Sequence, residues 1–388
     1  MNEIGYFHEQ EFGCDPEVVV SAPGTIDIIG DLGYQEDGMS VQIALDRYLS
    51  VAISRRKDVS LRFFSADLNE RKRTTLPNLK YRREDRWANY PKGVINEVVQ
   101  LGYELSGMDL TIKSDIPPGI GLGASAALGV ATAVGVAAVN ELRLGDFQII
   151  QSASMAESSF MSIDSTITDQ FTTTIAKEDK GVFLDLSTLN YEYLPVKLGE
   201  AKLLLTISNV PLVPAVEELQ ERKDRVAECV EFLRQRKGTP SLRELSTEDL
   251  NSSMGIVPED MRRLCLHVLQ ERERAIDARN FLESGDVTTL GKLLTRSHES
   301  QRDNYEISCP EIDWLVKRTG EIDGIYGSRM IGQGFGGCTL SLVKETSIPR
   351  YVERLDEYER IFGFRPETLI CHPADGVELL TQPTARVG

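Results

Sequence analysis

The chain has 388 residues, 41% hydrophobic and 27% charged, a composition typical of a folded globular protein. Its length exceeds what one hydrophobic core usually supports, so we expect two domains with a cleft between them. Lysine and arginine number 43 against 60 aspartates and glutamates, and the net charge of −17 argues against nucleic acid or an anionic membrane surface as partners.

Cysteines and histidines indicate neither a disulfide framework nor a metal centre. The six cysteines are scattered without a CxxC pair, which is typical of a protein that keeps its thiols reduced. The four histidines lie far apart and form no HExxH pattern, so a zinc site is not expected. There is no basic and apolar leader and no uninterrupted apolar stretch of about 18 residues, so we expect a cytoplasmic protein without a membrane span.

The first third of the chain is rich in strand patterns. Residues 17–31 indicate a strand, a Pro-Gly turn and a second strand of alternating apolar residues. Residues 48–56 and 59–67 repeat the alternation with valine, isoleucine and phenylalanine. Residues 87–105 then have apolar side chains at helical spacing, and a short strand at 110–113 leads into a glycine-rich loop.

Helices dominate the patterns that follow. Residues 124–142 are apolar nearly all round, which predicts a helix buried on most sides, and residues 147–160 are also helical in pattern. The stretch 168–196 is interpreted as β-structure. We place a domain boundary near residue 200, which gives domains 1–200 and 201–388. Charged amphipathic helices are predicted beyond it, at 216–235, 259–284 and 288–305.

The loop before the buried helix has the composition of a phosphate-binding loop. Its segment GIGLGA, residues 119–124, matches the GxGxxA pattern of dinucleotide-binding proteins, but the acidic residue required at the end of the next strand is missing. No lysine follows the glycines as a P-loop requires. Free amide groups at a helix N-terminus, glycines that permit close approach and the Ser125 hydroxyl suit a triphosphate and its metal. A tight turn capped by Ser125 is the plainer alternative.

Two further glycine clusters lie near the two ends of the chain. SAPGTIDIIGDLGYQEDG, residues 21–38, interrupts a strand region. RMIGQGFGGCTLSLV, residues 329–343, contains GxGxxG, but a strand follows where a dinucleotide fold needs a helix. Each cluster alone also suits a turn.

The three clusters in this order resemble the motifs of the GHMP kinases, and finer matches point to the galactokinase family within them. The early APG…GD, the central PxxxGLGxSAA and the late GxGFGGC carry the resemblance, and RWANYPKGVI, TDQF, SHESQRDNYEISCPEID and ETLICHPADGVELL look like further galactokinase segments. The resemblance covers nearly the whole chain. It implies an α/β (α+β) two-domain GHMP kinase fold, with the active site in the cleft between the domains and with ATP and a sugar as ligands.

The resemblance also implies roles for particular residues. Ser125 and Glu157 would hold Mg²⁺, and Asp169 would face the sugar hydroxyl as the catalytic group. Gly334 in the late loop would line the sugar site. From the residues alone, Glu157 also suits a surface helix, and Asp169 and Gly334 suit turns. The residues expected at the ATP phosphates are Pro117, Gly119, Gly121, Leu122, Gly123, Ala124, Ser125 and Ala126.

The first motif departs from the family pattern. Galactokinases have a sequence close to APGRVNLIGEHTDYNGG where this chain has APGTIDIIGDLGYQEDG, so Thr25 replaces a basic residue and Asp31 replaces glutamate. Both remain candidate substrate residues, but a typical galactose pocket is not encoded. A cation beside a transferring phosphoryl group can supply several powers of ten in rate. We hypothesise that Arg222 replaces that charge or grips an acidic sugar; a solvent-facing helix residue is the alternative.

Two functional classes follow from these patterns. The first is an ATP-dependent kinase that acts at the anomeric hydroxyl of a sugar other than galactose. The second is a catalytically inactive relative that binds sugar and nucleotide as a sensor. The joint presence of Ser125, Glu157 and Asp169 favours the enzyme, and a dehydrogenase is a distant third interpretation. Trp87 and Asn89 are candidate adenine contacts, and a monomer or a homodimer is expected.

Overall fold

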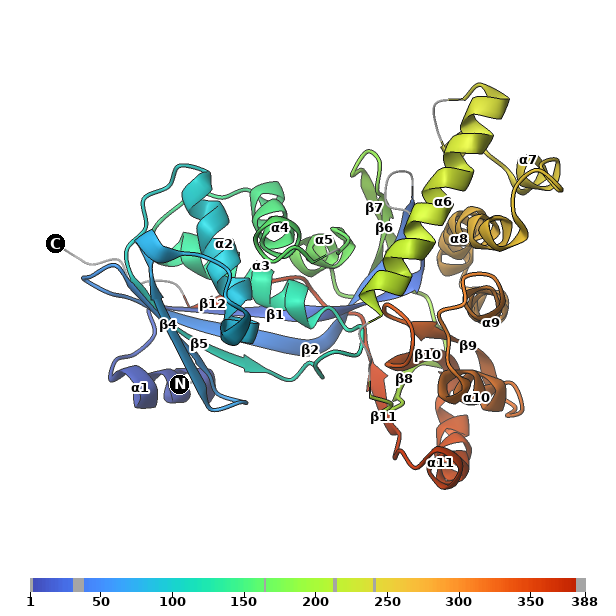
Figure 1. Cartoon of the computed structure of the whole chain (residues 1–388). Coiled ribbons are helices and arrows are strands. Elements are labelled where there is room, and N and C mark those ends of the chain that lie inside the picture. The colour runs from blue at the N-terminus through green and yellow to red at the C-terminus, as the bar shows by residue number, and fades with distance from the viewer. Residues whose placement is uncertain (1–2, 31–37, 164, 212–214, 240–241, 382–388) are drawn as a thin grey trace.

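The computed structural model describes residues 3–30, 38–163, 165–211, 215–239 and 242–381. Within these residues the chain forms two β-sheets, each covered by helices (Figure 1). This arrangement confirms the mixed α/β fold expected from the sequence. No helix in the described residues combines the length and the apolar character needed to cross a membrane.

The first sheet takes its strands from both ends of the chain. Its members are β1 (Val18–Ile29), β2 (Met39–Arg55), β3 (Ser60–Ser65), β4 (Glu70–Thr75), β5 (Met108–Ser114), β6 (Lys180–Asp185), β7 (Tyr191–Pro195) and β12 (Glu378–Thr381). The order is β12-β1-β2-β5-β3-β4, with β6 beside the first residues of β2 and β7 beside β6. All pairs are antiparallel except β3 with β5. The sheet therefore joins the two ends of the described chain through β1 and β12.

Strand β1 continues through Pro23 and Gly24, where the sequence pattern predicted a turn between two strands; that prediction was wrong. The pairing of β1 with β2 shifts register between these two residues, which marks a β-bulge. Bulges are among the few places where a sheet accepts proline. Pro23 pairs with Tyr48 and Gly24 with Leu45, so the extra residues lie on β2, and Thr25 continues β1 opposite Ala44.

Helices cover both faces of the first sheet. On one face lie α2 (Asn89–Gln100), α3 (Ala124–Val139), α4 (Asp146–Met155) and α5 (Thr168–Ile175), and on the other lies α1 (Glu3–Phe12), as Figure 1 shows. The central helix α3 contacts β1, β2 and the other three helices on its face. Its Ala- and Val-rich sequence is buried on most sides, which confirms the buried helix predicted from its composition.

Helix α5 occupies a segment that the sequence pattern assigned to β-structure, and that assignment was wrong. The run TDQFTTTI is rich in β-branched residues, which favour strands. Packing decides otherwise, because Phe171 and Ile175 lie one helical turn apart and are buried together against Ile150 of α4 and Val182 of β6. As a result Asp169 lies in the first turn of a helix.

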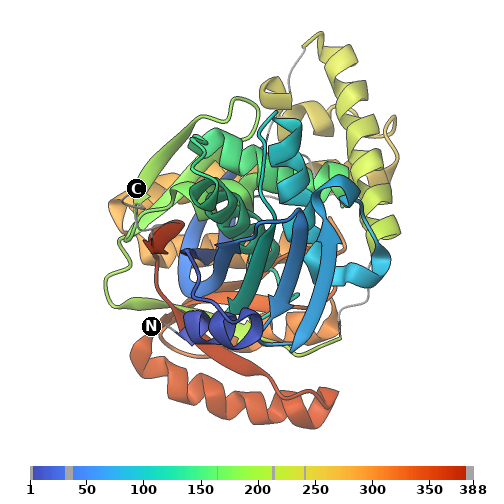
Figure 2. The same cartoon turned by 90° about the vertical axis from the view of Figure 1, so that its left-hand side faces the viewer.

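The second sheet is smaller and wholly antiparallel. Its strands are β8 (Ala201–Ile207), β9 (Ile325–Ile331), β10 (Cys338–Lys344) and β11 (Glu367–Cys371), in the order β11-β8-β10-β9. The associated helices are α6 (Val216–Lys237), α7 (Thr247–Asn251), α8 (Glu259–Ser284), α9 (Val287–Asp303), α10 (Pro310–Thr319) and α11 (Ile348–Phe362). Helices α6 and α11 lie at opposite ends of this half in both views (Figure 1, Figure 2). The three charged helices predicted from the sequence are confirmed as α6, α8 and α9.

Short helical turns complete the described secondary structure. They are η1 (Leu76–Asn78), η2 (Arg83–Ala88), η3 (Ala156–Phe160), η4 (Leu242–Glu244) and η5 (Glu345–Ser347), of which η3 is a π-helical turn that extends α4.

The two halves share a buried interface. One hydrophobic cluster joins side chains of β1, β2 and α3 with Leu203 and Leu205 of β8, Ala275 of α8 and Leu290 of α9. Helix α8 contacts both β1 and β2, and α9 packs on β9. The boundary near residue 200 stays a prediction, and the first strand of the second sheet begins at Ala201.

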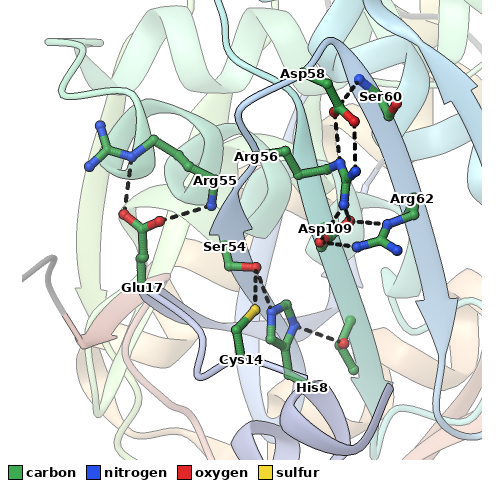
Figure 3. A network of polar contacts seen from close by, with 11 residues as sticks. His8, Cys14, Glu17, Ser54, Arg55, Arg56, Asp58, Ser60, Arg62 and Asp109 are labelled. Carbon is green, nitrogen blue, oxygen red and sulfur yellow. Dashed lines mark hydrogen bonds and ion pairs between the residues drawn. The ribbon is translucent and has the colours of Figure 1, made fainter. Parts of the chain in front are cut away.

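A polar network fastens α1 to the outer face of the first sheet (Figure 3). The fully buried His8 ring contacts the Thr111 hydroxyl of β5 through Nδ1 and the Ser54 hydroxyl of β2 through Nε2, each at 2.9 Å. Beside it, the buried Asp109 carboxylate accepts hydrogen bonds from Arg56 and Arg62. Burial lowers the pKa of His8 from 6.5 to about 4, so the ring is neutral at pH 7.

Because the His8 ring is neutral in the folded protein, the free energy of unfolding depends on pH. Between pH 6.5 and about pH 4 the unfolded chain binds a proton at His8 and the folded chain does not, so the free energy of unfolding falls as pH falls. The loss from this group at pH 4.5 is on the order of 2 kcal/mol. We expect His8→Gln to reduce the difference between urea unfolding free energies at pH 7 and pH 4.5. An unchanged difference would show that His8 is not the titrating group.

Candidate active site

The glycine loop before α3 has a backbone conformation that residues with side chains rarely adopt. Gly119, Gly121 and Gly123 have φ of +74°, +81° and +63°, in the left-handed region. Gly123 occupies the N-cap of α3 and has no side chain to cap the first amide groups of the helix. Ser125 is the second residue of α3 and not its cap. The loop thus presents an uncapped helix N-terminus, the form in which helices bind phosphate groups.

The fold brings all three glycine clusters of the sequence together. A Cβ on Gly121 would lie 2.6 Å from the Cα of Gly332, so the central loop and the late loop meet backbone to backbone. The early motif touches the same loop, because the Thr25 amide donates to the Leu122 carbonyl at 3.1 Å. A Cβ on Gly123 would lie 2.1 Å from the Thr25 Oγ1. Only residues without a side chain allow this close approach.

Thr25 joins the loop to Asp169. Its buried hydroxyl donates a hydrogen bond to Oδ1 of Asp169 at 2.7 Å. Burial raises the pKa of Asp169, and hydrogen bonds from Thr25 and Gln42 oppose the rise. A hydroxyl therefore lies beside Asp169 at the position where the family resemblance implies a basic residue.

Glu157 lies in the π-helical turn η3 next to Ser125. The Glu157 side chain is buried, and its Oε1 has no hydrogen-bond partner among the described residues. Burial raises the pKa of Glu157, the nearby Ser165 and Ser125 hydroxyls lower it, and the charge of Asp169 raises it further. The structure thus brings Ser125, Glu157 and Asp169 into one neighbourhood, from three different helical elements.

The late glycine loop connects β9 to β10 and is held from both sides. The Phe335 amide donates to the Ile307 carbonyl at 2.7 Å, and a Cβ on Gly334 would lie 2.7 Å from the same oxygen. On the other side, Gly337 approaches the backbone of Ile120 in the glycine loop before α3. Gly334, with φ of +97°, therefore lies between the glycine loop before α3 and the segment around residue 307.

Arg222 of α6 reaches the neighbourhood of this late loop. Its guanidinium lies 5.6 Å from the centre of the Phe335 ring. Nε donates to the Tyr305 carbonyl at 2.9 Å, Nη2 to the Glu306 carbonyl at 3.0 Å and Nη1 to the Glu218 carbonyl at 3.0 Å. The side chain thus ties α6 to residues 305–306, and its part in binding substrate stays a prediction.

The other residues predicted from the sequence differ in where they lie and in what they contact. Asp31 falls outside the described residues. Asn89 is buried and exchanges hydrogen bonds with the backbone of Arg82, while Trp87 donates to Glu70 at 3.0 Å, so both have partners within the protein. Of the expected phosphate-binding residues, Leu122, Gly123 and Ala126 are buried, Pro117, Ala124 and Ser125 are half-buried, and Gly119 and Gly121 are exposed.

Sequence reasoning missed Gln42 of β2. This buried side chain donates to Asp27 and accepts from the Thr172 hydroxyl of α5 at 2.6 Å, and it also contacts Asp169. A polar amide inside the apolar strand MSVQIAL was the available signal, since a buried polar side chain needs partners.

Comparison with known proteins places this site in a kinase class. The model for the N-terminal domain of GHMP kinases matches residues 89–177, which include the glycine loop before α3, Glu157 and Asp169. The model for the C-terminal domain of these kinases matches residues 278–360. A galactokinase galactose-binding signature matches residues 7–55. The fold and the site therefore define a GHMP kinase.

Similar proteins and solved structures identify the family within this kinase class. The galactokinases of Thermotoga maritima and of a Roseiflexus species are 36% and 33% identical to this chain, covering 92% and 95% of it and 99% and 94% of those proteins. The structure of Lactococcus lactis galactokinase with galactose superimposes with a TM-score of 0.91 over 97% of this chain and 98% of that one, at 26% identity. A mevalonate kinase at 19% identity and a TM-score of 0.64 shares the fold. The chain belongs to the galactokinase family of ATP-dependent sugar kinases. This membership favours the enzyme over the inactive sensor.

Proposed function

We propose that the chain transfers the γ-phosphate of ATP to the anomeric hydroxyl of a sugar and so forms a sugar 1-phosphate. The observation that carries the proposal is the meeting of Thr25 and Asp169 with the uncapped N-terminus of α3. One end of this site suits polyphosphate and the other offers a carboxylate to a hydroxyl.

Asp169 is proposed as the group that receives the proton of the sugar hydroxyl. Its pKa is raised by burial, which makes it a stronger proton acceptor than an exposed aspartate, and Thr25 and Gln42 keep the carboxylate in one orientation. The α3 amide groups and the glycine loop would stabilise the charge that develops on the phosphoryl oxygens.

The residues present fit Mg²⁺. A kinase magnesium site takes one or two carboxylates together with substrate phosphates, and Glu157 supplies a buried carboxylate oxygen without a hydrogen-bond partner beside the Ser125 hydroxyl. When bound, the metal would neutralise charge on the phosphates.

The sugar is proposed to be a hexose whose contacts differ from those of the typical family member. The galactose-binding signature and the names of the relatives make galactose the first sugar to test. Thr25 supports an altered pocket, since it replaces a cation and is fully buried against Asp169. We also propose the cytoplasm as the location, because all six cysteines are free thiols.

A sugar panel tests the proposed reaction directly. ADP release with Mg-ATP would be measured for galactose, other hexoses, uronic acids and amino sugars. We expect at least one sugar to give turnover on the order of 1–100 s⁻¹, with the product phosphorylated at the anomeric carbon. Ligand-dependent thermal stabilisation without ADP release from any sugar would contradict the proposal.

Truncation of Arg222 tests whether it grips an acidic sugar. If it does, Arg222→Ala should raise the KM of a uronic acid by about tenfold to a hundredfold and leave the KM of a neutral sugar nearly unchanged. If the carbonyl contacts of Arg222 are its whole role, the variant should lose thermal stability and show equal effects on all sugars. That second result would remove the acidic-sugar hypothesis.

A further inference from the structure

A buried charge cluster lies where the second half of the molecule meets the end of β1. The Glu271 carboxylate of α8 accepts from Nε of Arg274 at 2.6 Å, from the Ser297 hydroxyl of α9 at 2.8 Å and from Nη1 of Arg329 in β9 at 3.3 Å. Glu271 and Arg329 are only 3% and 1% exposed. Burying these charges costs desolvation, and each charge would be left uncompensated without the others.

Two hydrogen bonds of this cluster cross to the first sheet. Nη1 of Arg329 donates to the Ile28 carbonyl at 2.9 Å, and the Gly30 amide donates to Oε1 of Glu271 at 3.2 Å. Both partners are backbone groups at the end of β1. Helix α8 contacts both β1 and β2, and Ile28 and Ile29 at the end of β1 are buried, so this junction lies inside the molecule.

The contact between Arg329 and Ile28 links two strands that lead to opposite sides of the proposed active site. Ile28 follows Thr25 by three positions on β1, and Thr25 holds Asp169. Arg329 lies on β9 three positions before Gly332, which directly follows the strand and packs on Gly121 of the proposed phosphate loop. Apolar contacts at the interface allow sliding, whereas charged hydrogen bonds to backbone groups have fixed distances and directions.

We propose that Glu271 and Arg329 are positioning residues for the phosphoryl transfer. They fix the end of β1 against β9, and so fix Thr25 and Asp169 relative to the late glycine loop. Neither residue contacts the reacting atoms in this account. The inference rests on the proposed sugar kinase reaction and concerns the sugar half of the site.

Arg329→Met tests the proposal, with Arg274→Met as the matched control. Both substitutions remove one arginine from the same carboxylate. Arg274 lies on the same helix as Glu271, whereas the hydrogen bonds to Ile28 and Gly30 described above involve Arg329 and Glu271. We expect Arg329→Met to lower kcat/KM for the sugar by about tenfold to a hundredfold, because small displacements cost such factors. The Kd of a non-hydrolysable ATP analogue, measured without sugar, should change by less than about threefold.

The comparison separates a positioning role from a purely structural one. Arg274→Met should lower the unfolding temperature and leave the sugar kinetics of the folded protein unchanged, and Arg329→Lys should restore part of the lost kcat/KM. Equal effects of the two methionine variants on sugar kinetics, or a loss of ATP-analogue binding as large as the loss in kcat/KM, would overturn the proposal.

Failure of the proposed reaction gives a different result. If the wild-type protein turns over no sugar, the proposed function is wrong. The positioning role is then tested by the rise in unfolding temperature that sugar binding causes. We expect this rise to shrink in Arg329→Met and to persist in Arg274→Met. An equal rise in both variants, or no rise in the wild type, overturns the inference.

Discussion

Replacing Asp169 by asparagine is expected to lower kcat for phosphoryl transfer by about 10²-fold to 10⁴-fold, the range of a lost general base. Asparagine keeps the shape of the side chain and can still accept the Thr25 hydrogen bond, but it cannot take up a proton. Steady-state ADP release with the preferred sugar measures the loss. Binding of an ATP analogue with Mg²⁺, measured by calorimetry, should remain nearly unchanged, because Asp169 is proposed to act on the sugar hydroxyl and not to hold the nucleotide.

A carboxylate away from the site provides the control. Asp146 lies exposed in the first turn of α4, so Asp146→Asn removes a charge of the same kind at a helix N-terminus without touching the site. Its kcat should stay within about twofold of the wild type. Loss of nucleotide binding in Asp169→Asn, in place of loss of transfer, would show that Asp169 has been given the wrong role.

Gly121→Ala is expected to weaken binding of the ATP analogue by about a hundredfold. The added Cβ would lie 2.6 Å from the Cα of Gly332, and backbone atoms cannot move aside as a flexible side chain does. The phosphate loop and the late loop must therefore separate, which displaces the amide groups proposed to hold the phosphates. Calorimetric titration of the analogue measures the effect.

Gly119→Ala separates the clash from the backbone strain. Gly119 has φ of +74°, close to the +81° of Gly121, and a Cβ there would meet nothing within 4 Å. In both variants an alanine must adopt a left-handed backbone conformation, which destabilises the loop by about 1–2 kcal/mol. Only in Gly121→Ala does the added Cβ also clash with Gly332. Equal losses of affinity in the two variants would mean that the contact between the loops does not support nucleotide binding.

Periodic and compositional signals predicted much of the fold. Helix α8 begins at Glu259 and ends at Ser284, as its amphipathic pattern indicated, and α6 extends only two residues beyond the predicted end. The Ala-rich helix after the phosphate loop was predicted from its lack of a polar face. Such signals are local, because the spacing of apolar residues reports directly which face of a helix is buried.

Features that depend on distant contacts could not be predicted in this way. β-branched residues suggested a strand at α5, and only burial of Phe171 and Ile175 against other elements makes the segment helical. Pro23 and Gly24 indicated a turn, but the neighbouring strand β2 converts it to a bulge. The partners of Arg222 at residues 305–306 lie on a segment more than 80 positions away, and the sequence gives no sign of that proximity.

The sequence predicted which residues belong to the candidate site, but not how they contact one another. Glycine patterns and the family resemblance singled out Ser125, Glu157 and Asp169. The hydrogen bond from Thr25 to Asp169 and the participation of Gln42 follow from the packing of β1 and β2 against α5, which no local pattern encodes.

A structure of the protein with a non-hydrolysable ATP analogue and Mg²⁺ tests the central claim most directly. The account predicts the triphosphate at the amide groups of residues 119–126, with the metal between Ser125, Glu157 and the phosphates and the γ-phosphate facing Asp169. A triphosphate bound elsewhere, with the uncapped end of α3 holding only solvent, would contradict it.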